Sequence, residues 1–408
     1  MPEGQAGSTG RWTATRSAGL ERLAAFLPRA GRSYQAERNH DTGPDWSNVS
    51  TLAPWLHAQL VSEADVLKVV LDEHNSSDAY KFTSEVFWRI YFKGHLEQRP
   101  SLWFDYCAKR DEAFARIDGN AGLRTAYAEA VEGRTGIEAF DTWARELVAH
   151  GFLHNHARMW FASIWIFTLK LDWTLGADFF LRHLMCADAA SNTLNWRWVA
   201  GLHTRGKAYA ATASNIAKFT ARRDDGPLEV DGLARGVTAL DDDGAPAVPL
   251  DLPDGTFPDA PYALLLHDEG ASHEPLDLPR PPDLVIGAER AASRSPLAIG
   301  EPAARFAHDA VRSGLEDAAK AYDCPSMPWE GEMPVSTMEA MGLAHVVTPH
   351  LPVGWTRDAL SPGLDASRMR VTQLVSPLSR ATWPYAKAGY HGVRKRMNDI
   401  LAEVGLSA

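Results

Sequence analysis

The chain has 408 residues, of which 45% are hydrophobic and 23% are charged, and its formal net charge is −11. This balance is typical of a folded globular protein and excludes an intrinsically disordered chain. The length is sufficient for two domains with cores of ordinary size. The three cysteines, Cys107, Cys186 and Cys324, lie far apart in the sequence, which excludes a four-cysteine iron–sulfur or zinc site.

The charge is unevenly distributed along the chain. Residues 11–223 contain 26 Lys and Arg against 23 Asp and Glu, whereas the remaining residues contain 15 against 29. The first part can therefore carry a local basic groove, and the second part is a poor candidate for contact with nucleic acid. Met1–Gly10 lacks the apolar core of a secretory signal, and the most apolar run, 159–169, is too short to cross a membrane. We expect a cytoplasmic protein with no membrane partner.

Residues 12–223 are predicted to form a helical domain. Apolar residues recur at three- and four-residue spacing in four segments, 19–29, 63–74, 84–97 and 139–151. Gly151 is expected to end the last of these helices. The domain is also aromatic, since 11 of the 14 tryptophans precede residue 200.

The composition changes after this domain. Residues 224–258 are rich in Asp, Gly and Pro and are predicted to form a linker. Residues 259–408 then alternate apolar runs with helical patterns, which predicts a smaller Rossmann-like α/β domain with a parallel sheet. The expected strands are 262–270, 283–289, 344–349 and 371–377, and the expected helices are 302–322 and 387–405.

Two short patterns point only weakly to chemistry. The segment GLHTRGKA, 201–208, nearly fits a phosphate-binding loop, but Ala208 stands where a magnesium-binding hydroxyl is needed. The segment HNH, 154–156, lacks an acidic or cysteine partner at ligand spacing, so no metal site is predicted. Glu85 and Arg89, taken alone, are an ordinary ion pair one helical turn apart.

Several segments taken together are more specific, and the stretch DAASNTLNWRW, 188–198, is the most informative of them. Their order and spacing over roughly residues 20–220 resemble the FAD-binding helical domain of the photolyase/cryptochrome family. The segments are Tyr34 to Arg38, VSTLAPWL (49–56), EVFWRIY (85–91), GRTGI (133–137), HNHARM (154–159), LDWTLGADFF (171–180) and DAASNTLNWRWVAG (188–201).

The resemblance implies non-covalently bound FAD. The positions that match the cofactor site are Tyr34, Ser50, Leu52, Arg89, Asn155, Arg158, Cys186, Asp188 and Asn192. A cationic Arg158 near the flavin would favour its anionic reduced form. Trp196 and Trp173 match the first two members of the tryptophan chain that photoreduces the flavin.

The resemblance also implies damaged DNA as the partner. Glu85, Trp88, Met159, Asn192 and Trp198 match the catalytic positions of the pyrimidine-dimer photolyases, where an aromatic wall and polar groups receive the flipped lesion. Arg38, Arg89 and Trp198 match positions that contact DNA.

The sequence departs from the family at several of these positions. Cys186 stands where an aspartate usually pairs with the arginine matched by Arg158, and Ala53 replaces a hydroxyl of the phosphate turn. Ala130 falls at the usual outer tryptophan, and Leu194 and Asn195 replace two glycines. These departures put the redox poise of the flavin and the route of its electrons in doubt.

The α/β segment follows the helical domain, whereas family members usually begin with it. YALLLHDEGASHEPL (262–276) resembles the first strand and turn of the antenna domain, which suggests a circular permutation; an unrelated appended domain is the alternative.

The resemblance favours blue-light repair of a cyclobutane pyrimidine dimer by reduced FAD. A cryptochrome-like light or redox sensor with a signalling partner is the second reading, and a FAD-binding scaffold without light chemistry is the third. The antenna chromophore and the oligomeric state stay open.

Overall fold

A computed structural model of the protein describes residues 11–406, so the prediction about Met1–Gly10 lies outside the described residues. Between residues 11 and 223 the described chain is helical and contains no strand, as predicted. This helical part consists of α1 (Arg16–Phe26), η1 (Leu27–Arg29), α2 (Arg32–Glu37), α3 (Ala53–His57), α4 (Glu63–Glu73), α5 (Ser76–Glu97), α6 (Ser101–Gly119), α7 (Ala121–Val131), α8 (Glu138–His150), α9 (Asn155–Ser163), η2 (Ile164–Thr168), α10 (Trp173–His183), α11 (Ala189–Val199) and α12 (Ala213–Thr220).

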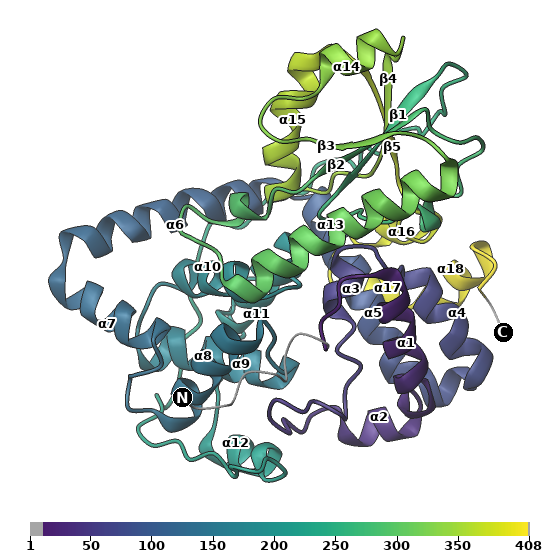
Figure 1. Ribbon diagram of the computed structural model, residues 1–408. Helices are drawn as coiled ribbons and strands as arrows, with labels where there is room; N and C mark the ends of the chain where they lie inside the picture. The colour runs from purple at the N-terminus through teal and green to yellow at the C-terminus, as the bar shows by residue number, and fades with distance from the viewer. Residues whose placement is uncertain (1–10, 407–408) are drawn as a thin grey trace, which may run out of the picture.

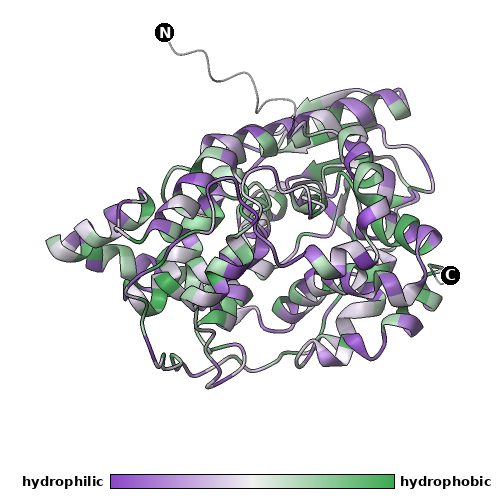
Figure 2. Cartoon of the chain, turned by 90° about the horizontal axis from the view of Figure 1, so that it is seen from below, coloured by the Kyte–Doolittle hydropathy of each residue, from purple (hydrophilic) through white to green (hydrophobic). Residues whose placement is uncertain are grey.

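Local sequence signals set the ends of these helices. Ser62 caps α4 through a reciprocal pair of hydrogen bonds with Asp65, and Asn75 caps α5 by accepting from the backbone of Asp78. Gly151 ends α8 in the left-handed conformation, with φ of 63°, which confirms the predicted helix end. Hydrophilic and hydrophobic residues are mixed along the helices, as expected where one face covers a core (Figure 2).

The second part contains a five-stranded parallel sheet with the order β3-β2-β1-β4-β5. Its strands are β1 (Tyr262–His267), β2 (Leu284–Ala288), β3 (Ser326–Pro328), β4 (His345–Pro349) and β5 (Arg370–Leu374). Four of them lie within or next to the predicted segments. The three-residue β3 was not predicted, because two of its three residues are exposed and it lacks an apolar run.

Helices cover both faces of this sheet (Figure 1). On one face, Leu264 and Val347 pack with α13 (Glu301–Tyr322), and on the other, Leu265 and Ile286 pack with α15 (Trp355–Ser367). Helix α14 (Val335–Ala340) completes the second layer. The combination of a helical part and a smaller parallel α/β part agrees with the predicted fold class.

The sheet part contacts the helical part through the loop that follows β1. The backbone amide of Ala271 donates to the carbonyl of Ala58 at 2.8 Å. Gly314 lets α13 pass over this loop, because a Cβ at this position would lie 1.5 Å from the carbonyl oxygen of Ala271. Helix α13 also contacts α8 and α10, so it lies between the sheet and the helical part (Figure 1).

The prediction of one closing helix over 387–405 was wrong. The segment instead forms α17 (His391–Arg394) and α18 (Met397–Glu403), after α16 (Pro377–Thr382) and η5 (Trp383–Tyr385). Gly392 of α17 lets this helix approach the preceding segment closely, because a Cβ there would lie 2.7 Å from the carbonyl oxygen of Tyr385. These short helices pack along α5 rather than on the sheet, and Trp383, Val393 and Met397 join the core of the helical part.

The predicted linker, 224–258, contains neither helix nor strand in the structure. It nevertheless lies against the helical part: Leu228 is buried, and the amide of Leu240 donates to the carbonyl of Ala200 at 2.9 Å. The proposed domain limits and the circular permutation remain predictions. Among the described residues, no helix is both long and apolar enough to span a membrane.

Candidate functional site

Two adjacent cavities in the helical part contain most of the predicted site residues. The larger, of about 290 Å³, lies between α2, the turn before α3, α5 and α9. The smaller, of about 70 Å³, lies between α9, α10 and α11. Asn155, Arg158 and Met159 of α9 line both cavities, so this helix is their shared wall.

The predicted residues divide between these cavities and their surroundings. Those that line the larger cavity are Tyr34, Arg38, Ser50, Leu52, Glu85, Asn155, Arg158 and Met159. Those that line the smaller cavity are Asn155, Arg158, Met159, Cys186, Asn192, Trp196 and Trp198. Trp88, Arg89, Trp173 and Asp188 are not among the lining residues of either cavity.

Arg158 is the cation at the junction of the two cavities. Its Nε donates to the carbonyl of Leu153 at 2.9 Å, which fixes the side chain, and its terminal nitrogens lie 3.6 and 3.7 Å from Cys186 Sγ. Sulfur is a weak acceptor. Within the described chain no carboxylate lies within 4.0 Å of Arg158, so its charge is available to an anionic group in the cavity.

Polar side chains around Arg158 are also held in fixed orientations. Asn192 donates from Nδ2 to the carbonyl of Ala177 at 2.9 Å, which leaves its amide oxygen free on the side of the smaller cavity. On the rim of the larger cavity, Arg38 forms an ion pair with Glu85 at 2.6 Å. The turn that contains Ser50 is kept open by Thr51, which adopts a φ of 52°.

The aromatic candidates differ in their surroundings. Trp196 is almost fully buried, and its indole N–H has no acceptor among the described residues. Trp198 is half-buried and stacks on Tyr209 at a centroid distance of 5.4 Å. Trp88 stacks on Tyr390 at 3.8 Å with an interplanar angle of 16°, so the C-terminal segment covers one of its faces.

Arg89 and Asp188 belong to a buried charged cluster between the helical part and the sheet. Asp188 pairs with Arg89 at 3.4 Å and with Lys93 at 3.2 Å, and Lys93 also pairs with Glu269 at 2.6 Å. Burial alone would raise the pKa of Asp188, but the charges of Lys93 and Arg89 outweigh it and hold the pKa far below its ordinary value. This cluster joins the two parts of the molecule.

His57 completes this cluster. Its ring is fully buried, neither nitrogen has a hydrogen-bond partner among the described residues, and burial lowers its pKa well below the ordinary value, so the ring is neutral. Donor atoms of His57, Asp188 and Glu269 lie within 4.8 Å of one another, a spacing that a metal ion could bridge. Lys93 already provides a cation to both carboxylates, however, so the arrangement is explained without a metal.

Sequence reasoning missed Lys93, Glu269 and Tyr390. Lys93 follows Arg89 by one helical turn and stands among buried residues of α5, so a lysine there was a usable signal of a buried partner. Glu269, from the loop after β1, and Tyr390, from the C-terminal segment, reach the helical part only through the tertiary fold.

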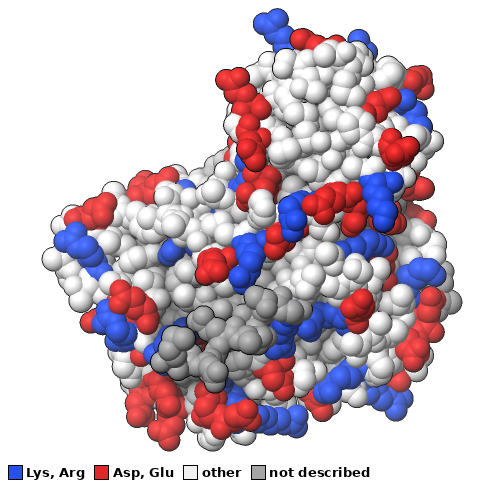
Figure 3. All heavy atoms as spheres, in the orientation of Figure 1, with Lys and Arg blue, Asp and Glu red and all other residues white. Residues whose placement is uncertain are grey.

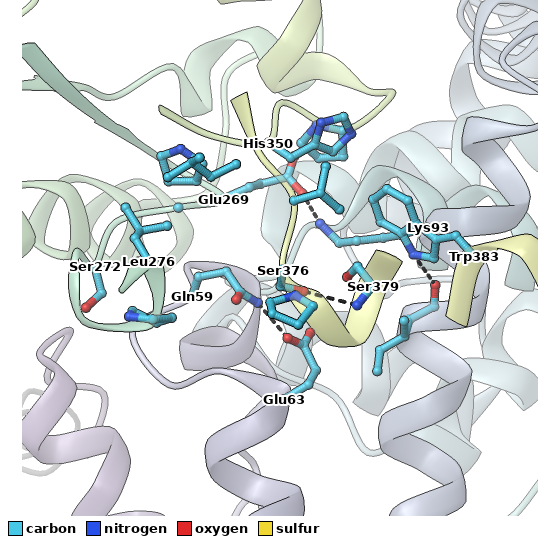
Figure 4. A pocket seen from close by; sticks show the side chains of 18 residues that line it. Gln59, Glu63, Lys93, Glu269, Ser272, Leu276, His350, Ser376, Ser379 and Trp383 are labelled. Carbon is cyan, nitrogen blue, oxygen red and sulfur yellow. Dashed lines mark hydrogen bonds and ion pairs between the residues drawn. The ribbon is translucent and has the colours of Figure 1, made fainter. Parts of the chain in front are cut away.

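A further cavity of about 120 Å³ lies at the carboxyl ends of β1, β4 and β5, facing α5 (Figure 4). The strand order reverses between β1 and β4, which is where open α/β sheets generally bind ligands. Lys93, Glu269 and His350 point into the space between the two parts of the molecule (Figure 4).

The surface over these elements has no single sign of charge. On the face shown in Figure 3, Lys and Arg alternate with Asp and Glu along α13 and over the helical part. Ion pairs on α13, such as Arg312 with Asp309 and with Glu316, are exposed. The basic residues that line the larger cavity or the neighbouring depression are Arg11, Arg22, Arg29, Arg38 and Arg158.

Comparison with known proteins defines the class of this site. Residues 82–226 match the family model described as the FAD binding domain of DNA photolyase. Three groups around the two cavities suit a flavin: the guanidinium of Arg158, the amide of Asn192 and the buried indole of Trp196. The protein is therefore a FAD-binding flavoprotein. Over this part the chain is similar to proteins of the photolyase/cryptochrome family.

Individual relatives carry both of the family's names. The chain is 33% identical over 193 residues to a deoxyribodipyrimidine photo-lyase of Agrobacterium fabrum, covering 47% of this chain and 39% of the relative. It is 35% identical over 156 residues to one of Streptomyces griseus, covering 38% and 32%. It is 31% identical over 214 residues to a chloroplastic/mitochondrial cryptochrome DASH of Ostreococcus tauri, covering 49% and 36%. The chain thus spans about a third of the length of the curated relatives it matches.

Proposed function

We propose that this protein is a blue-light-driven DNA photolyase that transfers an electron from reduced FAD to a cyclobutane pyrimidine dimer. One observation carries the proposal: Glu85, Met159 and Trp198, predicted to contact the lesion, line the same two adjacent cavities as the predicted cofactor residues. A flipped lesion and a flavin would then both lie against α9.

The cofactor would be held by residues from four elements. The side chain of Ser50 and the backbone around Leu52 would bind the pyrophosphate, and Tyr34 and Asn155 would line its path. Arg158, held by Leu153, would stabilise negative charge on the reduced flavin. FAD would supply the light absorption and the transferred electron, and the amide of Asn192, fixed by its bond to Ala177, would be available to the ring.

The DNA would be bound by the rim of the larger cavity. Arg38 would contact the phosphate backbone, and its ion pair with Glu85 would hold that carboxylate ready to accept a hydrogen bond from the flipped bases. Trp198, stacked on Tyr209, would provide a rigid aromatic wall for the dimer. Arg89 is less suited to DNA contact, because it is buried in the cluster with Asp188.

The affinity for damaged DNA tests this assignment. Fluorescence anisotropy would compare an oligonucleotide that contains one thymine dimer with the undamaged strand. We expect preferential binding of the dimer, loss of that preference in Trp198→Ala, and weaker binding of both strands in Arg38→Ala. The exposed Arg312→Ala is the matched control and should bind normally. Equal affinity of the wild type for both strands would contradict the proposal.

One contact favours a second function, that of a light or redox sensor. Tyr390 covers a face of Trp88, which is the aromatic position that a dimer would need, and Tyr390 is itself anchored through a hydrogen bond from its hydroxyl to the carbonyl of Ser84 at 3.0 Å. In a sensor this stack would be the element released by a change of flavin charge. Light-dependent proteolysis of the C-terminal segment, without repair, would support this function instead.

A further inference from the structure

The family resemblance assigns the electron chain to Trp196 and Trp173, but the ring contacts in the structure follow another direction. Trp196 meets Trp165 at a centroid distance of 6.2 Å, and Trp165 meets Tyr127 at 6.1 Å, both nearly perpendicular. Trp165 is completely buried and Tyr127 is half-exposed. The three rings form a continuous path from the smaller cavity to the surface.

Gly176 permits the first of these contacts. A Cβ on this residue of α10 would lie 2.3 Å from the Trp196 ring and 3.0 Å from the Trp165 ring, so any larger residue would separate or displace the two indoles. The π-helical turn η2, which contains Trp165, sets this ring beside α10. The local backbone therefore holds the two tryptophans in contact.

Hydrogen bonding favours movement of an electron hole along this path. The Trp196 indole N–H has no acceptor, whereas the Trp165 N–H donates to the carbonyl of Asp172 at 2.8 Å. An acceptor stabilises the positive charge of an oxidised indole, so the hole is better accommodated on Trp165 than on Trp196. Tyr127 is partly exposed, whereas Trp196 and Trp165 are buried, so Tyr127 is the ring of this path that reaches solvent.

The branch through Trp173 is less favourable for two reasons. The Arg197 guanidinium lies 6.0 Å from the centroid of the Trp173 ring, and a nearby cation opposes positive charge on that ring. The next ring, Tyr106, lies 5.9 Å from Trp173 but is almost fully buried, and its hydroxyl has no hydrogen-bond acceptor among the described residues. Oxidation of Tyr106 would leave its proton without a destination.

We infer that Trp196, Trp165 and Tyr127 form the electron relay of this protein, and that Tyr127 is its surface terminus in place of the missing outer tryptophan. The inference rests on the proposed light-driven function. With FAD bound and excited by light, Trp196 would give up one electron to it, Trp165 would reduce the oxidised Trp196, and Tyr127 would reduce the oxidised Trp165. Tyr127 releases its proton to water and becomes a neutral radical. A thiol in solution then returns one electron and one proton to Tyr127 and is itself oxidised.

Arg182 keeps the terminal tyrosine in place during this cycle. Its Nη donates to the Tyr127 hydroxyl oxygen at 3.0 Å, and its Nε donates to Asp178 at 2.9 Å. The donated hydrogen bond can persist when the phenol loses its own proton, since the oxygen remains an acceptor. Tyr127 therefore needs no rearrangement between its reduced and oxidised forms.

The test compares Tyr127→Phe with two variants of the other branch, Tyr106→Phe and Trp173→Phe. Anaerobic blue-light photoreduction of the FAD-loaded protein is followed with dithiothreitol as reductant, and radicals are identified by electron paramagnetic resonance in protein with ring-deuterated tyrosine. We expect Tyr127→Phe to lose the tyrosyl signal and to slow photoreduction. Tyr106→Phe and Trp173→Phe should keep both the tyrosyl signal and the wild-type rate of photoreduction. Because Tyr127 is half-exposed, its replacement by Phe should preserve the fold.

The opposite pattern would overturn the relay: an unchanged tyrosyl signal in Tyr127→Phe, or loss of photoreduction in Trp173→Phe alone. A wild type that binds FAD but shows no photoreduction would mean that neither branch reduces the flavin, whereas failure of the proposed function is read separately from the repair assay with chemically reduced protein. The relay is then judged by pulse radiolysis, in which azide radicals oxidise tryptophan. A lower tyrosyl yield in Tyr127→Phe than in the wild type supports it, and equal yields overturn it.

Discussion

Cys186 offers a direct way to change the electrostatics of the proposed flavin site. Its sulfur faces both terminal nitrogens of Arg158, at 3.6 and 3.7 Å, and supplies no charge to balance the guanidinium. The substitution Cys186→Asp would place a carboxylate at this position. The resulting ion pair would withdraw positive charge from the cavity, which should disfavour the anionic reduced flavin.

The size of this effect follows from the observed separation. Two unit charges about 4 Å apart interact by about 4 kcal/mol at an effective dielectric constant of about 20. Burial of the new carboxylate offsets part of this energy, and hydrogen bonds to a charged group contribute about 1.5–3 kcal/mol net. A change of about 1.4 kcal/mol in the reduced state corresponds to about 59 mV for one electron. We therefore expect the midpoint potential of the flavin to fall by roughly 60 mV.

Spectroelectrochemical titration of bound FAD would measure this potential in the wild type, Cys186→Asp and Cys186→Asn. The asparagine variant is the matched control, because it has the same shape as aspartate without the charge. We expect its potential to remain near that of the wild type. Equal potentials for the aspartate and asparagine variants, or a rise with aspartate, would refute the assignment of Arg158 as the cation beside the flavin.

Three further predictions concern stability and access to the site. Burial lowers the pKa of His267 to about 4, so the unfolded chain binds the proton first and stability falls as pH drops from about 6.5 to 4. In His267→Gln, the loss of unfolding free energy between pH 7 and pH 5 should be smaller by roughly 2 kcal/mol, and urea titrations with equal losses would disprove this. Arg223→Ala should destabilise the protein by about 3–5 kcal/mol, because it leaves Asp41 and Glu146 buried without their cation; a urea-measured loss under about 1 kcal/mol would contradict this role. Tyr390→Ala should uncover Trp88 and raise the affinity for dimer-containing DNA in the anisotropy assay, and an unchanged affinity would show that the stack does not limit access.

The sequence predicted the fold well wherever local physics decides it. Apolar periodicity located α4, α8 and α13, and short apolar runs located four strands. The failures were a strand and a helix whose state depends on tertiary neighbours: β3 forms beside β2, and the closing helix breaks between α17 and α18, where Val393 and Met397 pack into the core of the helical part. Neither neighbour is visible in the local pattern.

The candidate site was likewise predictable only in part from the sequence. Residues of α9 and of α11 come together as their spacing in the sequence suggested, and the exchange at Cys186 was recognisable before the structure. Lys93 with Glu269, and Trp88 with Tyr390, are contacts between segments far apart in the chain, so spacing carries no information about them. Trp165 lies in the apolar run 159–169, where the sequence offers no reason to single it out, and only its contact with Trp196 suggests a role.

The central claim is tested most directly by light-dependent repair. Chemically reduced, FAD-loaded protein would be mixed anaerobically with an oligonucleotide that contains one thymine dimer, illuminated with blue light, and assayed for intact thymine. The account predicts recovery that requires both light and FAD and that is lost in Trp198→Ala. No recovery from a protein that binds FAD and the damaged strand would contradict photolyase activity and leave the sensor as the function to examine.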